Sequence, residues 1–331
     1  MRAFEYASPT TREQAVKLLG SNWDDAAVFA GGTDLLALMK DEVAHPGRLV
    51  NIKDITEFKG ITYSPTAGLK IGATVTIQEL LDHSIVRLHY RALTQAAEGI
   101  SSPQIRAMGT VGGDLCQRPR CWYYRGGFGL LGQDESGKSL VEEGDNRYHA
   151  IFGNSGPAYF VNPSSLAPAL IAFGAKLRAY GPKGSRDIPV EKFFVTPQSA
   201  GDREYDLGPN EIVGEILVPH PPAGAKSATY EVRQKEALDW PLATASVVLH
   251  VSGGSIRKAR VVMGHVAPVP WPSEGAEKSL IGKSVSETTA TAAGAAAVEG
   301  AKPLSKNGYK IQLARTAVKR AVLDAAKGGA K

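Results

Sequence analysis

Apolar residues near the N-terminus recur first at helical spacing and then in short continuous runs. Residues 11–19 have the spacing of an amphipathic helix. A buried-strand run at 26–30, a helical pattern from Asp34 to Met39 and a second strand run at 48–52 follow. A strand, a helix and a strand in this order predict a small α/β subdomain that ends near residue 55.

The next apolar segments predict a second and larger unit. Residues 69–74 have the pattern of a strand that leads into Thr76, and the spacing from Thr76 to Glu79 is that of a capping box at a helix start. Another helix is predicted over 86–97. From 101 to 156 the periodicity is lost and Gly, Arg and aromatic residues are frequent, which predicts a long functional loop.

Regular patterns return beyond this loop and end at a proline-rich segment. Ser164 and Ser165 are predicted to cap a helix that continues to Phe173, and a strand follows at 175–180. Proline removes a hydrogen-bond donor and resists regular structure, so the three prolines between 219 and 223 predict a linker.

The segment after the linker is predicted to be a separate domain. Runs at 242–251 and 256–266 flank a Ser-Gly-Gly turn and predict a β-hairpin, while helices are predicted for most of the rest. We therefore expect an α+β protein. Its expected divisions are a first domain at 1–222 with subdomains at about 1–55 and 56–222 and an inserted loop at about 116–160, and a second domain at 223–331 with a three-stranded sheet and a helix bundle.

Composition and charge exclude several classes of protein. The chain has 331 residues, 43% of them hydrophobic and 21% charged, and no apolar run approaches the roughly 20 residues that span a bilayer. The net charge of +5 is spread without a dense basic block, so nucleic acid is not an expected partner. No apolar core of a secretory signal follows the N-terminus, and Cys116 and Cys121 are expected to be thiols. We therefore expect a cytoplasmic protein without a membrane span.

Two glycine pairs next to hydrophobic segments are the main candidates for ligand binding. In 30–36 the pair stands between a strand and a helix, where bare backbone and helix N–H groups suit a phosphate. In 109–114 the pair follows Thr110, and its exposed amide N–H groups and the Thr110 hydroxyl suit the same ligand. The first segment is equally compatible with an ordinary strand-to-helix turn. Two such loops in one chain favour a large nucleotide cofactor.

Two other glycine patterns match known motifs without their structural context. Residues 132–139 satisfy the P-loop pattern and residues 127–132 the dinucleotide-binding pattern. Neither follows a buried strand or opens a long helix, as those motifs require. Asp134 and Glu135 would also repel phosphates. Neither an ATP site nor a nicotinamide site is expected there.

A set of segments, in this order, gives the chain a resemblance to a known family. They are AGGTDLL (30–36), SPQIRAMGTVGGDL (102–115), NPSSLAPALIAFGAKL (162–177), EIVGEILVP (211–219), DWPLATASVVL (239–249), GHVAPVPWP (264–272) and AEKSLIG (276–282). The chain resembles the FAD-binding subunits of the xanthine dehydrogenase, carbon monoxide dehydrogenase and hydroxybenzoyl-CoA reductase family of molybdenum hydroxylases. The resemblance covers nearly the whole chain.

The resemblance implies a two-subdomain FAD-binding fold of the vanillyl-alcohol-oxidase (PCMH) type, whose two glycine loops embrace the FAD diphosphate and whose C-terminal domain closes over the flavin. It implies no acid–base residue. The cofactor-binding residues implied by position are Ala30, Gly31, Gly32, Thr33, Asp34, Leu35, Thr110, Gly113, Asp114, Ser165 and Lys235. Ser165 stands where many relatives carry Asp, and Asp114 stands where Asn is common. An anion at Asp114 would need a hydrogen-bond donor or a rotamer turned away from the diphosphate.

The stretch QRPRCWYYR (117–125) is similar to hydroxybenzoyl-CoA reductase and periplasmic aldehyde oxidoreductase subunits that carry an inserted loop with a four-iron cluster. Cys121 stands at the first ligand position of that loop. The remaining residues to about 160 contain no other cysteine, and such a cluster needs four ligands. We expect neither an iron–sulfur cluster nor another metal in this chain.

The resemblance also implies partner subunits. A large molybdopterin-binding subunit would oxidise the substrate, and a small subunit with two [2Fe-2S] clusters would relay electrons to the FAD of this chain. A dimer of heterotrimers is among the implied assemblies, and a partner with its own signal could export the complex. Two alternatives stay open at this point, namely a stand-alone FAD-dependent oxidase and a non-catalytic assembly subunit with a degraded flavin site.

Overall fold

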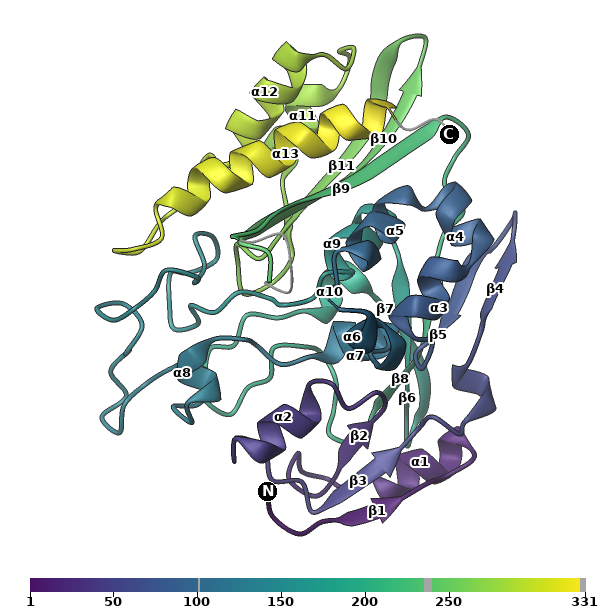
Figure 1. Cartoon of the computed structure of the whole chain (residues 1–331), viewed down its shortest axis with the longest axis vertical. Helices are drawn as coiled ribbons and strands as arrows, with labels where there is room; N and C mark the ends of the chain where they lie inside the picture. The colour runs from purple at the N-terminus through teal and green to yellow at the C-terminus, as the bar shows by residue number, and fades with distance from the viewer. Residues whose placement is uncertain (101, 235–239, 328–331) are drawn as a thin grey trace.

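Three β-sheets organise the computed structural model, which describes residues 1–100, 102–234 and 240–327. The sheets follow one another along the long axis of the molecule, with the N-terminal sheet at one end and the C-terminal sheet at the other (Figure 1). Helices pack against all three sheets. The predicted α+β class is confirmed.

A parallel sheet forms the N-terminal subdomain. Its elements are β1 (Glu5–Ala7), α1 (Arg12–Leu18), β2 (Ala27–Phe29), α2 (Leu35–Lys40) and β3 (Arg48–Asn51). The strand order is β1-β3-β2, and both pairings are parallel. The hydroxyl of Thr11 accepts a hydrogen bond from the Gln14 N–H, which caps α1 where the helix begins. The predicted strand, helix and strand are confirmed, and β1 is an additional strand.

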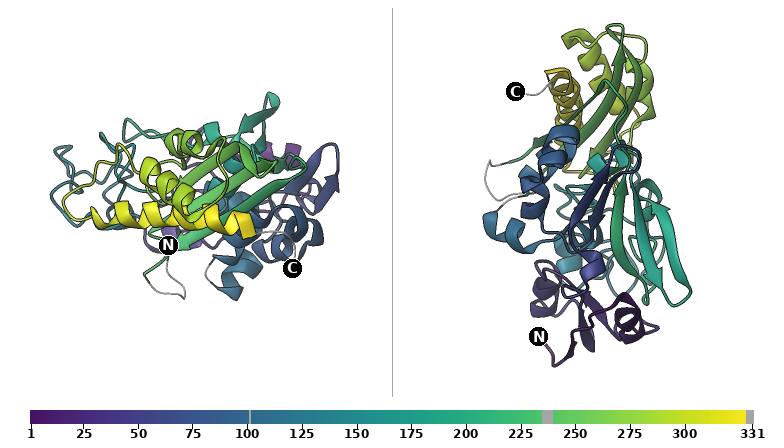
Figure 2. Two further views of the ribbon diagram at one scale, coloured as in Figure 1. Left: turned by 90° about the horizontal axis from the view of Figure 1, so that it is seen from above. Right: turned by 90° about the vertical axis from the view of Figure 1, so that its right-hand side faces the viewer.

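An antiparallel sheet of five strands forms the centre of the molecule. Its strands are β4 (Ile61–Ser64), β5 (Gly68–Gly72), β6 (Lys176–Gly181), β7 (Gly184–Pro189) and β8 (Ile212–Val218). They lie in the order β4-β5-β8-β6-β7, so β8 returns between two strands that precede it in the chain. Short helices cover one face of this sheet (Figure 2). They include α3 (Ile77–Asp82), α4 (Ser84–His89), α5 (Arg91–Glu98) and α9 (Ala167–Ala172), and a further helix, α10 (Val190–Phe193), follows β7.

The central region differs from the predicted helices in three places. The helix predicted over 86–97 is broken at Tyr90, whose backbone is not helical and whose buried hydroxyl donates to the carbonyl of Pro219 at 3.1 Å. Helix α9 begins only at Ala167, although the Ser164 hydroxyl makes the predicted capping contact by accepting from the Ala167 N–H at 3.0 Å. The predicted loop contains three helices too short to show a periodicity, namely α6 (Pro103–Met108), α7 (Val111–Cys116) and α8 (Trp122–Arg125).

The C-terminal region is a sheet covered by helices. Its elements are β9 (Ala225–Val232), β10 (Ala243–Ser252), β11 (Ser255–Gly264), β12 (Trp271–Pro272), α11 (Glu274–Leu280), α12 (Glu287–Ala297) and α13 (Tyr309–Lys327). The predicted hairpin is confirmed as β10 and β11. The sheet has four strands, in the order β12-β11-β10-β9, so the prediction of three was wrong. Strand β12 has only two residues and therefore shows no alternation in the sequence.

Helix α13 lies across β9 and β10 (Figure 1). Its small residues, such as Ala314, Ala317 and Ala321, are fully buried, which lets the helix approach the sheet closely. Within the described ranges, no helix combines the length and apolarity needed to cross a bilayer.

The inserted loop packs against the C-terminal region. Ile151 and Phe152 are buried in the same apolar cluster as the residues of β10, β11 and α13. The Asn307 side chain donates to the carbonyl of Ala150 at 3.1 Å, and the Asn154 side chain donates to the carbonyl of Lys302 at 2.8 Å. The loop therefore joins the C-terminal sheet to the remainder of the chain.

The start of helix α3 anchors the second glycine loop. Thr76 and Thr110 form an antiparallel bridge, and the Ile77 N–H donates to the carbonyl of Gly109 at 2.9 Å. The predicted capping box is confirmed, since the Thr76 hydroxyl accepts from the Glu79 N–H and the Glu79 carboxylate accepts from the Thr76 N–H. The cap thus holds both the helix and the loop.

We predict that Thr76→Ala removes this cap and lowers the midpoint of thermal unfolding by about 2–4 °C, the effect of roughly 1 kcal/mol. Thr66→Ala is the matched control, because the Thr66 hydroxyl contacts only the Ser64 hydroxyl in an exposed turn. Differential scanning calorimetry of both variants is the measurement. Equal midpoints for the two variants would contradict the anchoring role.

Candidate cofactor site

The two glycine loops are in direct contact. A Cβ atom on Gly31 would overlap the carbonyl oxygen of Met108 and would lie 3.2 Å from the Cα of Gly109. Only glycine permits this approach of one backbone to another. The N-terminal subdomain and the central region therefore meet through direct contact of their backbones.

The first loop presents a run of free backbone donors. Among the described residues, the N–H groups from Gly31 through Leu35 donate no hydrogen bond to the protein. Gly32 has a φ of +72°, in the left-handed region that favours glycine, and a Cβ there would lie 2.6 Å from the Phe29 ring. The Ala30 carbonyl accepts from the Lys53 ammonium at 3.2 Å, which fixes the start of the loop. Such a turn suits an anionic ligand.

The second loop uses its amides internally. The Gly113 N–H donates to the Thr110 hydroxyl at 3.0 Å, and the Gly112 N–H donates to the carbonyl of Ala73 at 3.0 Å. The prediction that these glycines expose amide donors was wrong, because the Thr110 hydroxyl, which caps helix α7, accepts from Gly113 and the Ala73 carbonyl accepts from Gly112. A Cβ on Gly113 would meet only the Thr110 hydroxyl within 4 Å. A ligand could therefore approach the backbone of this loop closely at Gly113.

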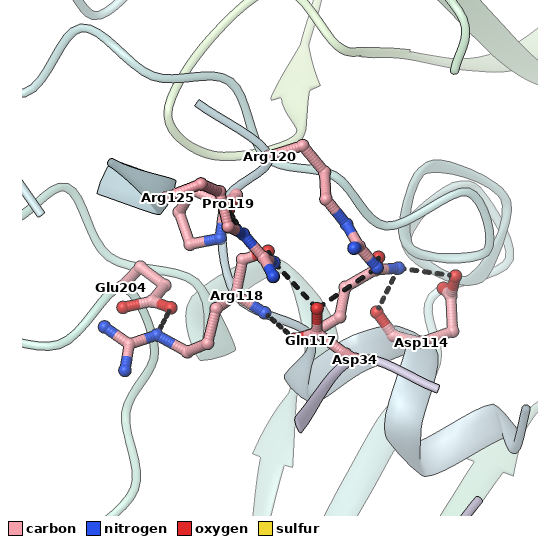
Figure 3. Close-up of polar contacts among 8 residues, drawn as sticks. All are labelled: Asp34, Asp114, Gln117, Arg118, Pro119, Arg120, Arg125 and Glu204. Carbon is pink, nitrogen blue, oxygen red and sulfur yellow. Dashed lines mark hydrogen bonds and ion pairs between the residues drawn. The ribbon is translucent and has the colours of Figure 1, made fainter. Parts of the chain in front are cut away.

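Three arginines of the segment 117–125 converge on Asp34 (Figure 3). One oxygen of Asp34 accepts from the backbone N–H of Arg118 at 2.8 Å, and the other lies 2.7 Å from Nη2 of Arg125 and 3.2 Å from Nη2 of Arg120. The Arg118 side chain turns away to an ion pair with buried Glu204. Two guanidinium groups therefore share the single carboxylate of Asp34, which leaves positive charge beside the first loop.

Both loops line one cavity of about 260 Å³, here called the large cavity. Aromatic side chains form much of the opposite wall, and the Arg203 guanidinium covers one of them, Trp23, at 4.2 Å from the ring centroid. The other aromatic residues of this wall are Tyr124 and Tyr205. Burial raises the pKa of Tyr124 despite the nearby charge of Arg118, so this phenol is neutral.

A small cavity of about 110 Å³ adjoins the large one. The two share the residues Thr33, Asp34, Thr110, Gly113 and Gln117. The far wall of the small cavity is made by Ile100, Ile105 and Trp240, so it lies between the glycine loops and the C-terminal region. The two cavities therefore adjoin one another at the glycine loops.

The carboxylate of Asp114 contacts Gln117 (Figure 3) and the residues that precede helix α9. It accepts from the Leu166 N–H at 3.0 Å and from the Gln117 side chain at 2.9 Å, and it also accepts from Ser164 and Ser165. These donors meet the requirement of an anion at this position. Burial raises the pKa of Asp114 in spite of these hydrogen bonds.

This geometry fits a dinucleotide. Free N–H groups and surplus positive charge lie where the two cavities adjoin, and a diphosphate there would need them. The large cavity has an aromatic and apolar wall for one ring system, and the small cavity has an apolar wall for another.

The family models also indicate a protein that binds a dinucleotide, FAD. The model described as the FAD binding domain in molybdopterin dehydrogenase matches residues 2–221, and the model of the CO dehydrogenase flavoprotein C-terminal domain matches residues 228–325. The chain belongs to this family. It is thus an FAD-binding oxidoreductase subunit of the molybdenum hydroxylase type, as the resemblance implied.

Relatives of known name and structure span the whole chain. The carbon monoxide dehydrogenase medium chain of Hydrogenophaga pseudoflava is 31% identical over 96% of both chains. The FAD-binding subunit of an aldehyde oxidoreductase from Escherichia coli is 30% identical over 95% of this chain and 96% of its own. The solved carbon monoxide dehydrogenase of Hydrogenophaga pseudoflava covers 98% of both chains with a TM-score of 0.75 at 31% identity. That of Oligotropha carboxidovorans covers 99% of both chains with a TM-score of 0.76 at 26% identity.

The structure brings most of the predicted cofactor-binding residues to these cavities. Those lining the large cavity are Ala30, Gly31, Gly32, Thr33, Asp34, Leu35, Thr110 and Gly113. Asp114 and Ser165 line the small cavity. Lys235 lies outside the described residues. Contact of each residue with FAD stays a prediction.

Several residues of the site were not predicted from the sequence. Arg120 and Arg125 were assigned to an inserted loop, and their spacing around Cys121 gave no sign that they reach Asp34. Trp23 and Arg203 come from separate turns, and no motif connects them. Only the concentration of arginine and aromatic residues between 117 and 125 was a usable signal.

We predict that Gly31→Ala lowers the FAD content of the purified chain by about tenfold or more, because the new methyl group forces the two loops apart. Gly201→Ala is the control, since a Cβ at Gly201 meets nothing within 4 Å. The ratio of flavin to protein absorbance is the measurement. A full flavin complement in Gly31→Ala would refute the assignment of this contact to the cofactor site.

We further predict that the stability of Asp114→Asn relative to the natural chain increases as pH rises. A carboxyl whose folded pKa is raised stabilises the fold most below its unfolded pKa of about 3.9, and that stabilisation is lost as pH rises through the folded pKa. Asparagine does not titrate, so the difference in thermal midpoint, variant minus natural chain, should increase from pH 4 to pH 7.

Asp202→Asn is the control with the opposite sign. Backbone N–H groups of Gln198 and Ser199 lower the pKa of Asp202, so its stabilisation is present above the unfolded pKa and is lost on acidification. The same midpoint difference should therefore fall as pH rises. Parallel trends in both variants would contradict the assignment of a raised pKa to Asp114.

Proposed function

We propose that this chain is the electron-transfer subunit of a heteromeric molybdenum hydroxylase. Its FAD would receive electrons from the [2Fe-2S] clusters of a small subunit and deliver them to an external acceptor. A large molybdopterin-binding subunit would carry out the chemistry on the substrate. The contact between the two glycine loops carries the proposal, because it brings two adjoining cavities together from two parts of the chain.

The residues of the site have distinct parts in this proposal. The free N–H groups from Gly31 to Leu35 would bind the diphosphate, with Arg120 and Arg125 supplying positive charge nearby. Asp34 would hold both arginines in place. FAD supplies the capacity to take up one or two electrons, which lets single transfers be combined into pairs. The chain's own contribution is binding, orientation and charge.

The relatives support the proposed partners. Two of them are named as medium chains of carbon monoxide dehydrogenases, and another is named as a xanthine dehydrogenase FAD-binding subunit. A dimer of heterotrimers remains part of the proposal, as does a cytoplasmic location. The division into domains at residue 222 is likewise proposed, and the matched ranges 2–221 and 228–325 support it.

The test is purification of the affinity-tagged chain from its native host. We predict absorbance bands near about 370 and 450 nm from FAD, about four iron atoms per flavin, and a molybdopterin-bearing large subunit in the same complex. The control is the tagged Gly31→Ala variant, which should retain its partners and lose the flavin bands.

Two results would overturn the proposal. A chain that purifies alone with FAD and oxidises small substrates without a partner would be a stand-alone oxidase. A complex that contains this chain without flavin would make it an assembly subunit.

A further inference from the structure

A third cavity of about 250 Å³, here called the side cavity, adjoins the small cavity. The two share Arg120, Trp240 and Pro241, so a single layer of side chains separates them. The side cavity lies between the inserted loop and the C-terminal sheet, and it includes no residue of either glycine loop. The space for the dinucleotide does not account for it.

The walls of the side cavity are aromatic and reach the surface. Trp122, Phe160 and Trp240 contribute flat apolar surface. Trp240 is 45% exposed and Tyr148 is 37% exposed, so these two residues stand at the opening to solvent. The Arg120 guanidinium lies 4.5 Å from the centre of the Trp240 ring and fixes that side chain. A planar ring suits such a cavity.

Two buried histidines of this cavity retain unused ring nitrogens. His149 and His265 are each 2% exposed, and both line the cavity. Among the described residues, Nδ1 of His149 and Nε2 of His265 have no hydrogen-bond partner. Burial lowers the pKa of His149 to about 4, so the imidazole is neutral. Its other nitrogen, Nε2, lies 3.2 Å from the Cys121 sulfur.

An unused buried polar atom costs free energy unless a ligand satisfies it. If the Cys121 thiol donates to Nε2 of His149, the remaining proton is on Nδ1, which is then a free donor. The burial of the Cys121 thiol raises its pKa and keeps it protonated, which favours this arrangement. His149 lines the side cavity, and a ligand oxygen placed there would satisfy this N–H.

A buried lysine contacts the backbone of the two histidines. Lys310 is 1% exposed, and its ammonium donates to the carbonyls of Tyr148, His149 and His265 at 3.2, 3.1 and 2.7 Å. These three backbone carbonyls are its hydrogen-bond partners among the described residues. Burial lowers the pKa of Lys310 to about 7. An amine that titrates near neutral pH can take up a proton when negative charge develops on a neighbouring ligand, so this wall favours such a ligand.

We propose that the side cavity binds the electron acceptor of this subunit and that the acceptor is a quinone. The inference rests on the proposed function, because it requires a reduced flavin in the adjoining space. A quinone combines a planar ring with carbonyl oxygens that accept hydrogen bonds, and negative charge develops on these oxygens as it is reduced. A nicotinamide dinucleotide would need phosphate-binding groups and a longer cavity.

The reaction balances with these two reactants alone. Reduced flavin, FADH2, loses two electrons and two protons and becomes FAD. The two carbonyl groups of the quinone gain them, so that each C=O double bond becomes a C–O single bond and two O–H bonds form. The aromatic layer of Trp240 separates donor from acceptor and lets electrons pass without contact of the rings.

Calorimetric titration of the oxidised, FAD-loaded full chain with duroquinone tests the inference. All ring carbons of duroquinone are substituted, which prevents addition of the Cys121 thiol. We expect one site with Kd of about 1–100 µM. His149→Phe keeps a flat ring but removes the donor, so Kd should rise about fivefold or more. Leu242→Trp should abolish binding by filling the cavity, whose wall includes Leu242.

His89→Phe is the matched control, because His89 is exposed on α4 and lines no part of this cavity. It should leave Kd unchanged, and thermal midpoints verify that each variant is folded. Failure of the loaded chain to bind duroquinone overturns the inference, as does equal weakening in all three variants. Binding only to the flavin-free chain overturns it too, since the flavin ring would then occupy the cavity.

The same samples separate this inference from the proposed function. The visible spectrum reports FAD independently of the calorimetric signal. A chain that holds FAD but does not bind duroquinone therefore contradicts only the assignment of the side cavity. A chain without FAD contradicts the proposed function, whatever its affinity for quinone. Anaerobic photoreduction followed by duroquinone should restore the 450 nm band, and His149→Phe should need a higher quinone concentration for the same rate.

Discussion

The contact of Gly31 with the backbone of Met108 is the constraint on which the site depends. It allows two parts of the chain with separate sheets to meet without intervening side chains, so the two cavities adjoin one another at the glycine loops. The first loop contributes unpaired N–H groups, whereas the second contributes an approachable backbone whose own amides are already bonded. The loops are therefore unequal, and a symmetrical clamp on the diphosphate does not describe them.

Asp34 shows how a carboxylate can assist an anion site. Beside a diphosphate it would be repulsive on its own, but it draws the guanidinium groups of Arg120 and Arg125 to the first loop (Figure 3). The segment 117–125 thus has a structural part that does not depend on any iron–sulfur cluster. It covers the glycine loops and also forms the wall between the small cavity and the side cavity.

The sequence predicted the elements that have their own local signals. The Thr76 capping box, the β10–β11 hairpin and the strand, helix and strand of the N-terminal subdomain are all present because cap, turn and periodicity are short-range properties. Tertiary contacts decided the rest. The break at Tyr90, the two-residue strand β12 and the turning of Asp114 toward α9 each depend on partners far away in the chain. Arg120 and Trp240 lie far apart in sequence, and no pattern indicates that they stack.

Lys310 lies at the seam between the inserted loop and the C-terminal region. It satisfies three buried carbonyl oxygens, so its ammonium holds the fold at this seam. Its pKa of about 7 also lets this amine gain or lose a proton near neutral pH. The amine adjoins two histidines with unused nitrogens, and all three residues face an aromatic space one side chain away from the small cavity. A histidine N–H and an amine that can take up a proton would together stabilise an oxygen that becomes more negative, which is the change that reduction of a quinone produces.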